Sequence, residues 1–407
     1  MLLNKIFFNS ILNRNANRIA IIAKGSGFSH SFSAVNTKCY HVAKILQEYG
    51  LRVVILSSIY YQEKPISKKT GKYKGVAFYA PSCHIKTQSK IVKAVHKIAY
   101  TWRVISFLTA LRFKFGKSYY IFDDNGLFLP FLVILSWFGV VELIFNIEEW
   151  PAAHDMPLKN KIVSHLFVVL ALKNCRKVVC VSSFLVDKAF HYNRHSTSFR
   201  LPSITAFSAP VTDTSLINSH QDACVNFLYC GNVGYYEVID TIIRAFDAVC
   251  RSREKSNVKL VLIISGDQVL LQKILNQIKE IHSPIQILTH VTDAELFEEY
   301  GQATCLLAPL RNTLQDQARF PQKISEYTSL SKPIITTKVG DIDQYFESDK
   351  SAIFIEDFSA SEIQKKFEYV IDNPNHVYRI GVEGNMVGRK YFDYHAYVSS
   401  FGRFVTS

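Results

Sequence analysis

The sequence predicts an α/β protein of two doubly wound, Rossmann-like domains, each with a mainly parallel sheet covered by helices. The chain has 407 residues, enough for two domains of about 200 residues each. Short, fully apolar segments alternate with longer helical stretches, as expected for strands buried in parallel sheets. The pattern begins again after a stretch rich in Pro, Ser and Thr at 201–226. With 48% hydrophobic and 20% charged residues, the chain is globular rather than disordered.

Each apolar segment marks an expected strand. In the first half, strands are expected at 19–23, 52–56, 76–79, 119–122, 143–147 and 178–181. In the second half, they are expected at 226–230, 259–264, 285–288, 305–308, 334–337 and 352–355. The first domain is expected to cover 1–210 and the second 211–385, with a C-terminal helix at 386–407 packing back on the first domain. Ligands of such sheets bind beyond the strand C-termini, so the cleft between the domains is the expected site.

Positive charge is concentrated in the first domain. Lys and Arg number 47 against 34 Asp and Glu, and the segment 64–122 contains no acid. Within it, apolar residues at 91, 95, 98, 102 and 105 predict an amphipathic helix next to Lys90, Lys93, Lys97 and Arg103. Such a helix suits an anionic membrane surface. A core-facing helix with solvated lysines is the alternative, and no nucleic-acid motif supports nucleic acid as the partner.

The sequence favours neither a membrane-spanning helix nor a signal peptide. The most apolar stretch, 127–141, is shorter than the about 20 residues needed to span a bilayer, so we expect a buried helix leading into a strand, with a single membrane span as the alternative. Polar residues interrupt the apolar N-terminus. The eight cysteines form no CxxC pair, and no HExxH occurs, so no metal site is expected.

Two glycine loops follow predicted strands. Gly25 and Gly27 follow the first strand, where glycine allows close backbone approach, but His30 occupies the place of a third fingerprint glycine. In the second domain, Gly231, Asn232 and Gly234 precede a helix, so their amides could point at an anion. An ordinary turn explains each loop equally well.

The segment 319–327 combines a helix start with charge. Pro321 suits the first position of a helix, and Phe320 cannot cap it, so the amides of Gln322 and Lys323 are expected to be open to an anion. Arg319 and Lys323 add two cations. Glu326 lies three residues further on the same side and could accept two hydrogen bonds from a ribose diol. This describes a nucleoside diphosphate site; a Lys323–Glu326 pair on a surface helix is the alternative.

The order of these segments resembles the second domain of retaining GT-B glycosyltransferases of family 4, the glycosyl transferases group 1. Residues 319–342 are similar to the pattern RFPxKxxEY…KPxxTxxVGxI of one sublineage. Residues 231–246, 260–267 and 291–309 resemble the family's glycine loop and helix, its central strand ending in Gly-Asp, and the segment around its base pocket. For the first domain, the resemblance rests on strand order and the Gly25–Gly27 loop.

The resemblance implies a metal-independent, hexosyltransferase-like enzyme without a cofactor. A nucleotide diphosphate-sugar donor would bind the second domain and the acceptor the first, with the anomeric configuration retained. Glu326 would bind the ribose, Arg319 and Lys323 would bind and stabilise the phosphates, and Gly25 and Gly27 would approach them. The chain departs from the family at Asn232 and Glu237, where cations are common, and at Ala318, where a glutamate is common.

Acidic residues also follow the strand at 143–147. Glu148 or Glu149 could act as a base or orient an acceptor hydroxyl, and Trp150 could stack on a sugar, with His154 a weaker acceptor-side candidate. An acid capping a helix and a core tryptophan are the alternatives. The expected acceptor is a glycan or polyprenyl-linked sugar of cell-surface polysaccharide synthesis, at the inner face of the cytoplasmic membrane. A GT-B-like sugar-nucleotide epimerase and a non-catalytic nucleotide-sugar-binding scaffold remain alternatives.

Overall fold

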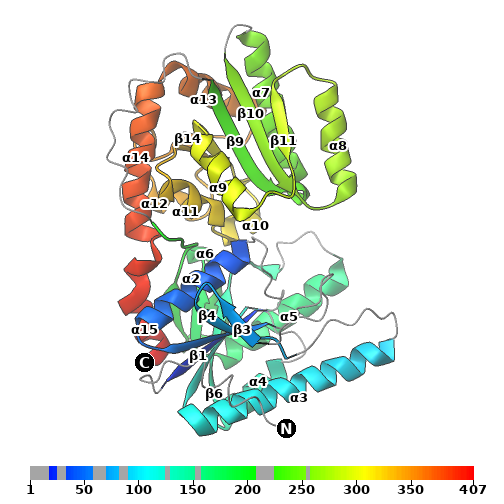
Figure 1. Cartoon of the computed structure of the whole chain (residues 1–407), viewed down its shortest axis with the longest axis vertical. Helices are drawn as coiled ribbons and strands as arrows, with labels where there is room; N and C mark the ends of the chain where they lie inside the picture. Colours follow the sequence, from blue (N-terminus) through cyan, green and yellow to red (C-terminus); the bar gives the residue numbers. More distant parts are fainter. Residues whose placement is uncertain are drawn as a thin grey trace. The chain divides into compact units, whose positions relative to one another are not determined.

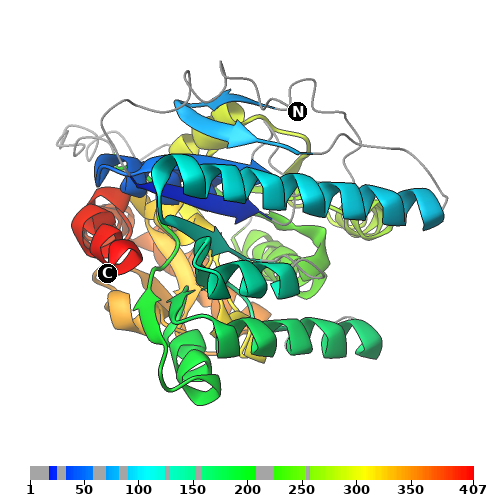
Figure 2. The same ribbon diagram turned by 90° about the horizontal axis from the view of Figure 1, so that it is seen from below.

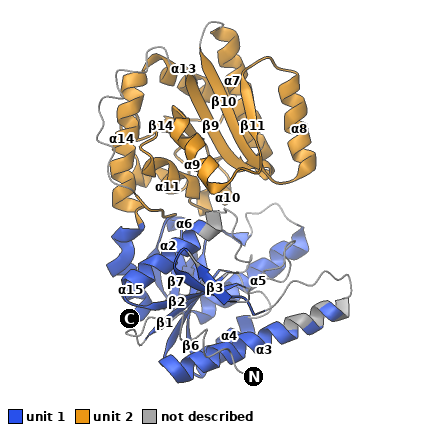
Figure 3. Ribbon diagram, viewed as in Figure 1, with its two compact units in different colours: residues 1–202, 394–407 blue, residues 203–393 orange. Residues whose placement is uncertain are grey.

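The computed structural model describes residues 18–24, 34–57, 70–81, 90–123, 129–151, 157–207, 224–253 and 257–407. The chain forms two compact units (Figure 3): unit 1 is Met1–Pro202 with Tyr394–Ser407, and unit 2 is Ser203–Asp393. The chain therefore leaves unit 1 at residue 202, whereas the sequence placed the boundary near 210. It returns at Tyr394, so residues 386–393, which we expected in the C-terminal segment, belong to unit 2.

Unit 1 contains a sheet, drawn in Figure 1. Its strand order is β3-β4-β2-β1-β5-β6-β7-β8. All neighbours are parallel except the β3–β4 pair. The strands are β1 Ile19–Lys24, β2 Arg52–Ser57, β3 Thr70–Tyr73, β4 Val76–Tyr79, β5 Ser118–Phe122, β6 Val141–Ile147, β7 Lys177–Cys180 and β8 Thr197–Arg200. The central strands are buried along their length, which is why they appear as continuous apolar runs in the sequence.

The handedness of the crossovers in unit 1 determines which face of the sheet each helix covers. They are α2 Ala34–Glu48, α3 Lys90–Phe115, α4 Leu129–Trp137, α5 Leu158–Asn174 and α6 Ser183–Tyr192. The connections through α3, α4, α5 and α6 all run in one direction along the sheet, whereas the connection through α2 runs in the other. Right-handed crossovers therefore place these four helices on one face and α2 on the opposite face. Figure 2 shows α3, α4 and α5 lying side by side.

The end of the chain completes unit 1. The short helix η5 Tyr394–Tyr397 leads into α15 Val398–Thr406, which packs on α2. A Cβ atom added at Gly402 would lie 2.1 Å from a ring atom of Tyr49, so only glycine permits this close approach. The Tyr394 hydroxyl donates to Glu48 over 2.9 Å, and Lys177 Nζ in β7 donates to the Val405 carbonyl over 3.0 Å.

Unit 2 contains a parallel sheet with the strand order β11-β10-β9-β12-β13-β14. The strands are β9 Val225–Asn232, β10 Val258–Ser265, β11 Ile285–Leu288, β12 Cys305–Ala308, β13 Ile334–Thr337 and β14 Ile353–Ile355. Phe227, Phe246 and Phe367 meet in its core, with the Phe227 and Phe367 ring centroids 4.3 Å apart. The helices are η4 Val233–Tyr235, α7 Tyr236–Ser252, α8 Gln268–Lys279, α9 Asp293–Gln302, α10 Leu314–Ala318, α11 Gln322–Ser329, α12 Ile342–Tyr345, α13 Ala360–Asp372 and α14 Pro374–Tyr391.

The predicted α/β fold and its strands are confirmed, with two additions and one correction. The sequence missed β3 and β8, which lack a long apolar run. The stretch 127–141 does contain a helix leading into a strand, α4 and β6, but the helix is not fully buried, because Phe131, Ile134 and Trp137 are exposed. In the part of the chain that the structure describes, no helix combines the length and apolarity needed to cross a membrane.

Candidate functional site

The start of α11 in unit 2 has no side-chain cap. The helix begins at Gln322, so Pro321 occupies the position before it rather than the first helical position we expected. No described side chain caps this end. The segment is held from both sides: the Phe320 ring packs 5.2 Å from Phe392, and Gln322 Nε2 donates to the Ile204 carbonyl over 3.0 Å. The first-turn amides therefore lack a side-chain cap, as do helix starts that bind phosphate groups.

Lys323 joins this helix to the glycine loop. Its Nζ donates to the Cys230 carbonyl over 2.8 Å and lies 4.2 Å from the centroid of the Tyr229 ring. Burial lowers the pKa of Lys323 to about 8, because water no longer solvates the ammonium group fully. The ammonium group of Lys323 thus joins the start of α11 to the glycine loop, two segments about 90 residues apart in the sequence.

Glu326 is buried one turn further along α11, with 2% of its surface exposed. Burial raises its pKa to about 7, and a hydrogen bond from Gln322 and the charge of Lys323 partly oppose this rise. Its Oε1 atom has no hydrogen-bond partner among the described residues. The surface-pair alternative fails, because Glu326 lies in the interior and the Lys323 ammonium is bound to the Cys230 carbonyl.

Arg319 is held by a network that the sequence did not reveal. The fully buried Asp316 contacts Arg319 Nη2 through Oδ1 over 2.5 Å and Arg311 Nε through Oδ2 over 3.1 Å. Arg319 also donates to the Tyr235 hydroxyl, and its guanidinium lies 4.4 Å from the centroid of that ring. Tyr235 ends η4, directly after the glycine loop, so the network places both arginines beside that loop.

The glycine loop itself is tightly built. The Asn232 side chain accepts a hydrogen bond from the Gly234 amide over 2.8 Å and so caps η4. A Cβ atom at Gly231 would lie 2.6 Å from the Tyr229 hydroxyl, so a larger residue would displace that tyrosine. Glu237 forms an ion pair of 3.2 Å with Arg311. Arg311 thus brings a positive charge from a distant segment of the sequence to Glu237, beside the glycine loop.

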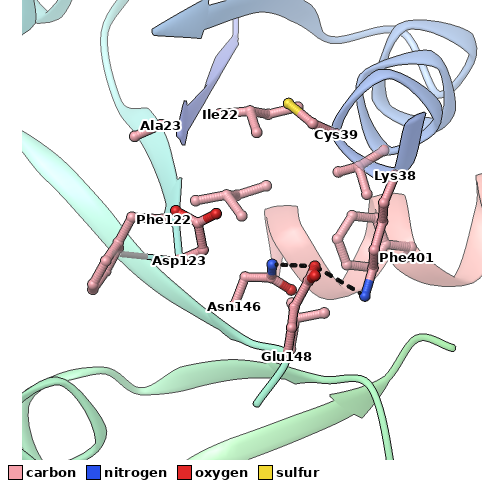
Figure 4. A pocket seen from close by; sticks show the side chains of 12 residues that line it. Ile22, Ala23, Lys38, Cys39, Phe122, Asp123, Asn146, Glu148 and Phe401 are labelled. Carbon is pink, nitrogen blue, oxygen red and sulfur yellow. Dashed lines mark hydrogen bonds and ion pairs between the residues drawn. The ribbon is translucent and has the colours of Figure 1, made fainter. Parts of the chain in front are cut away.

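Of the residues predicted for unit 1, Glu148 lines a cavity at the C-terminal ends of β1, β5 and β6 (Figure 4). Glu148 Oε1 accepts a hydrogen bond from Asn146 Nδ2 over 3.0 Å and lies 3.1 Å from the Nζ of Lys38, a buried residue of α2. Asp123 also lines the cavity. Sequence reasoning missed Lys38, which no motif marks and which reaches Glu148 only through the fold.

The neighbours of Glu148 have different environments. Glu149 is exposed. Trp150 is only 4% exposed, stacks 5.9 Å from Tyr192 and contacts His165 edge to face at 5.6 Å. Its ring is thus occupied by the core, and we do not retain it as a sugar-stacking residue. Gly25, Gly27 and His154 lie outside the described residues. Within the described ranges, no group of three or more His, Cys, Asp or Glu side chains could hold a metal ion.

Comparison with known proteins identifies the matching family and fold. Residues 220–385 match the model of the glycosyl transferases group 1. No curated protein shows a significant sequence match to the chain. Among solved structures, sucrose-phosphate synthase from Thermosynechococcus elongatus superposes with a TM-score of 0.69 at 14% identity, covering 96% of this chain and 98% of that chain.

Two further structures match over the same extent. Anabaena HepE, in complex with UDP and glucose, has a TM-score of 0.68 at 12% identity and covers 95% of this chain and 99% of its own. A trehalose-phosphate synthase from Burkholderia xenovorans, in complex with glucose-6-phosphate, has a TM-score of 0.66 at 13% identity. The match covers 96% of this chain and 100% of that chain. The chain therefore has the GT-B fold of glycosyltransferases, and its residues 220–385 match the glycosyl transferases group 1 model.

Proposed function

We propose that this chain is a retaining glycosyltransferase that moves a sugar from a nucleotide diphosphate-sugar to an acceptor. One observation carries the proposal: Lys323, in the first turn of the uncapped helix α11, is bound to the Cys230 carbonyl at the start of the glycine loop. The two segments that the sequence marked as candidate anion sites are therefore in contact with each other. A family match over these residues supports the same conclusion.

The chemistry of the donor side follows from its charges. When the bond between the sugar and the diphosphate breaks, negative charge develops on the leaving phosphate. Arg319, Lys323 and the amides of Gln322 and Lys323 would stabilise this charge without a metal ion. Glu326 would accept hydrogen bonds from the ribose diol at its unpartnered Oε1 atom. Gly231 and Gly234 would let the loop backbone approach the donor closely.

The acceptor is assigned to unit 1. Glu148, held by Lys38 and Asn146, would orient an acceptor hydroxyl or remove its proton at the edge of the cavity. The exposed Glu149 remains a second candidate for this role. We further propose that the acceptor is a glycan or a polyprenyl-linked sugar of cell-surface polysaccharide synthesis, and that the enzyme works peripherally on the inner face of the cytoplasmic membrane.

UDP-sugars are the donors to test first, because HepE was solved with UDP and with UDP-glucose. Calorimetry with UDP should show binding to the wild type that falls about tenfold or more in Arg319→Ala and Lys323→Ala, each of which removes a charge-assisted contact. Glu326→Ala should reduce turnover sharply. Lys365→Ala, which removes an exposed lysine of α13, is the matched control and should bind as the wild type does. Unchanged affinity and turnover in all three site variants would refute the site.

A non-catalytic nucleotide-sugar-binding protein is the second candidate. One observation favours it: Ala318 is buried where the family commonly has a glutamate. Product analysis with UDP-sugars and a mixture of acceptors separates the cases. Sugar transfer supports the proposal, binding without turnover supports the second candidate, and epimerised donor in the absence of acceptor would identify an epimerase.

A further inference from the structure

The helices α3, α4 and α5 of unit 1 carry apolar side chains that face solvent. These helices lie on one face of the sheet, side by side, as Figure 2 shows. Among the described residues, the exposed large apolar side chains lie on these helices or directly after α4, except for Phe190, Val269, Leu314 and Met386. An exposed apolar patch of this extent on a globular unit marks an interaction surface.

The helix α3 is apolar on two opposite sides. One side, with Tyr100, Val104, Phe107 and Leu111, is buried, and the Phe107 ring contacts Tyr79 at 4.6 Å. With a rotation of 100° per residue, Val95, Ile98, Trp102 and Phe113 lie within about 60° of one another on the opposite side. They are 58%, 59%, 64% and 88% exposed. The apolar positions 95, 98 and 102 of the predicted amphipathic helix therefore point away from the core.

The helix α5 repeats this arrangement. Its buried side contains Val168, Ala171 and Leu172. The opposite side exposes a stripe of apolar residues spaced mainly four apart, which are Leu158, Ile162, Val163, Leu166 and Leu170. The exposed residues Lys159 and Lys173 lie near the two ends of that stripe. An apolar stripe flanked by lysines is the pattern of a helix that lies in a membrane interface.

The helix α4 closes the gap between the other two. Its buried residues Leu129, Leu132 and Val133 face β6, whereas Ile134 and Trp137, with Phe138 just after the helix, are exposed. Tryptophan is favoured at the boundary between lipid head groups and acyl chains, because its ring is apolar and its N–H is polar. Two of the three tryptophans of the chain, Trp102 and Trp137, lie on this surface.

The positive charge of this surface indicates which kind of partner it binds. The sequence of α3 contains lysines and arginines and that of α5 contains lysines, whereas none of α3, α4 and α5 contains aspartate or glutamate. A second copy of the chain docking through the same helices would bring like charges together, which disfavours a symmetric protein contact. An anionic lipid surface accepts both the apolar side chains and the positive charge.

We infer that the exposed sides of α3, α4 and α5 form a single membrane-docking surface that inserts its apolar side chains into the head-group region of an anionic bilayer. The inference deepens the proposed function and rests on it, because a polyprenyl-linked acceptor lies in such a bilayer. It replaces the single basic helix expected from the sequence by a three-helix surface in which α4 and α5 also expose apolar side chains.

The test is co-flotation of the full chain with vesicles of phosphatidylcholine, with and without phosphatidylglycerol. The wild type should float with the anionic vesicles, and brominated lipids should quench the emission of Trp102 and Trp137 but not that of the buried Trp150. A variant with one substitution on each helix, Trp102→Ser, Trp137→Ser and Leu166→Ser, should bind about tenfold or more weakly. Val269→Ser on α8 removes an equally exposed apolar residue of unit 2 and is the control, which should bind as the wild type does.

Donor binding separates this inference from the proposed function. The triple variant should bind UDP with unchanged affinity, because the substituted residues lie in unit 1 and the donor site lies in unit 2. Flotation that is absent in the wild type, or unchanged in the triple variant, would overturn the docking surface whatever the result with UDP. A self-association that the triple substitution abolishes would assign the surface to a second copy and would also overturn it.

Discussion

Units 1 and 2 share a doubly wound plan but differ in how their outer helices meet solvent. In unit 2, α7 carries Glu237, Asp240 and Asp247 on its polar side and pairs them with arginines, as in the Arg244–Asp240 contact of 2.5 Å. In unit 1, α3, α4 and α5 carry no acid and expose Trp102, Trp137 and Leu166. The comparison teaches that packing on the sheet determines which residues occupy the inner side of a helix. The surroundings of the helix determine which residues occupy its outer side.

The largest effect should separate the inner and outer tryptophans of unit 1. Trp150→Ala should lower the free energy of unfolding by about 3–5 kcal/mol, because it empties a buried aromatic site. Trp137→Ala, at a 76% exposed position, should change it by less than about 0.5 kcal/mol. Urea denaturation of the two variants measures both values. A large loss in Trp137→Ala would show that the outer apolar side chains serve folding instead.

The next effect concerns the buried charge network of unit 2. Asp316→Asn should lower the free energy of unfolding by about 3 kcal/mol, because Arg311 and Arg319 lose the carboxylate that both contact. UDP affinity should fall as well, because Arg319 loses its position. Asp372→Asn is the control: its pair with Arg253 lies at the far end of α7, and such an exposed pair contributes at most about 1 kcal/mol. Equal losses in both variants would contradict the network's role.

The pH dependence of UDP binding should have two limbs. Glu326, with its pKa raised to about 7, accepts hydrogen bonds best when ionised, so affinity should rise with pH below 7. Lys323, with its pKa lowered to about 8, loses its positive charge above 8, so affinity should fall there. Each limb should change affinity by up to about tenfold per pH unit. In Glu326→Gln the rising limb should disappear in calorimetric titrations, and its persistence would exclude Glu326 as the group responsible.

The smallest effect should come from Glu237→Gln. Glu237 pairs with Arg311 beside the glycine loop, so its negative charge opposes an incoming diphosphate. Neutralising it should raise UDP affinity by about twofold, the size of effect expected from an exposed charge. Asp372→Asn, which removes an acid about 25 Å away along α7, should leave the affinity unchanged. Weaker UDP binding in Glu237→Gln would mean that the acid positions Arg311 rather than repels the donor.

Local patterns in the sequence predicted most of the fold. Apolar strands such as Lys259–Ile264 and Ile334–Thr337 were found because both of their faces are buried, which leaves a continuous signal. The edge strands β3 and β8 were missed because neither has a continuous apolar run. The strand β3 contains Gly71 and Lys72, and β8 contains half-exposed polar residues. The outer apolar stripe of α3 was recognised, but its inner stripe at Tyr100, Val104 and Phe107 was not, because the two alternate along the same helix.

The candidate site of unit 2, like the fold, was predicted only in part from the sequence. The spacing of Lys323 and Glu326 correctly placed both residues near one helix start, because three residues make nearly one turn. The spacing could not distinguish a buried pair of groups from a surface ion pair, since burial depends on distant segments such as Cys230. Arg311, Asp316 and Lys38 were missed for the same reason. Each of them acts through a contact that only tertiary structure creates.

The return of the chain to unit 1 at Tyr394 has a consequence for biosynthesis. The Val405 carbonyl, at the very end of α15, accepts a hydrogen bond from Lys177 in β7, and Gly402 lies against Tyr49. Although ribosomes deliver unit 1 first, that unit cannot acquire its final helix until residue 406 has emerged, after the whole of unit 2. A premature stop codon near residue 395 would therefore damage the half of the molecule that was translated earliest.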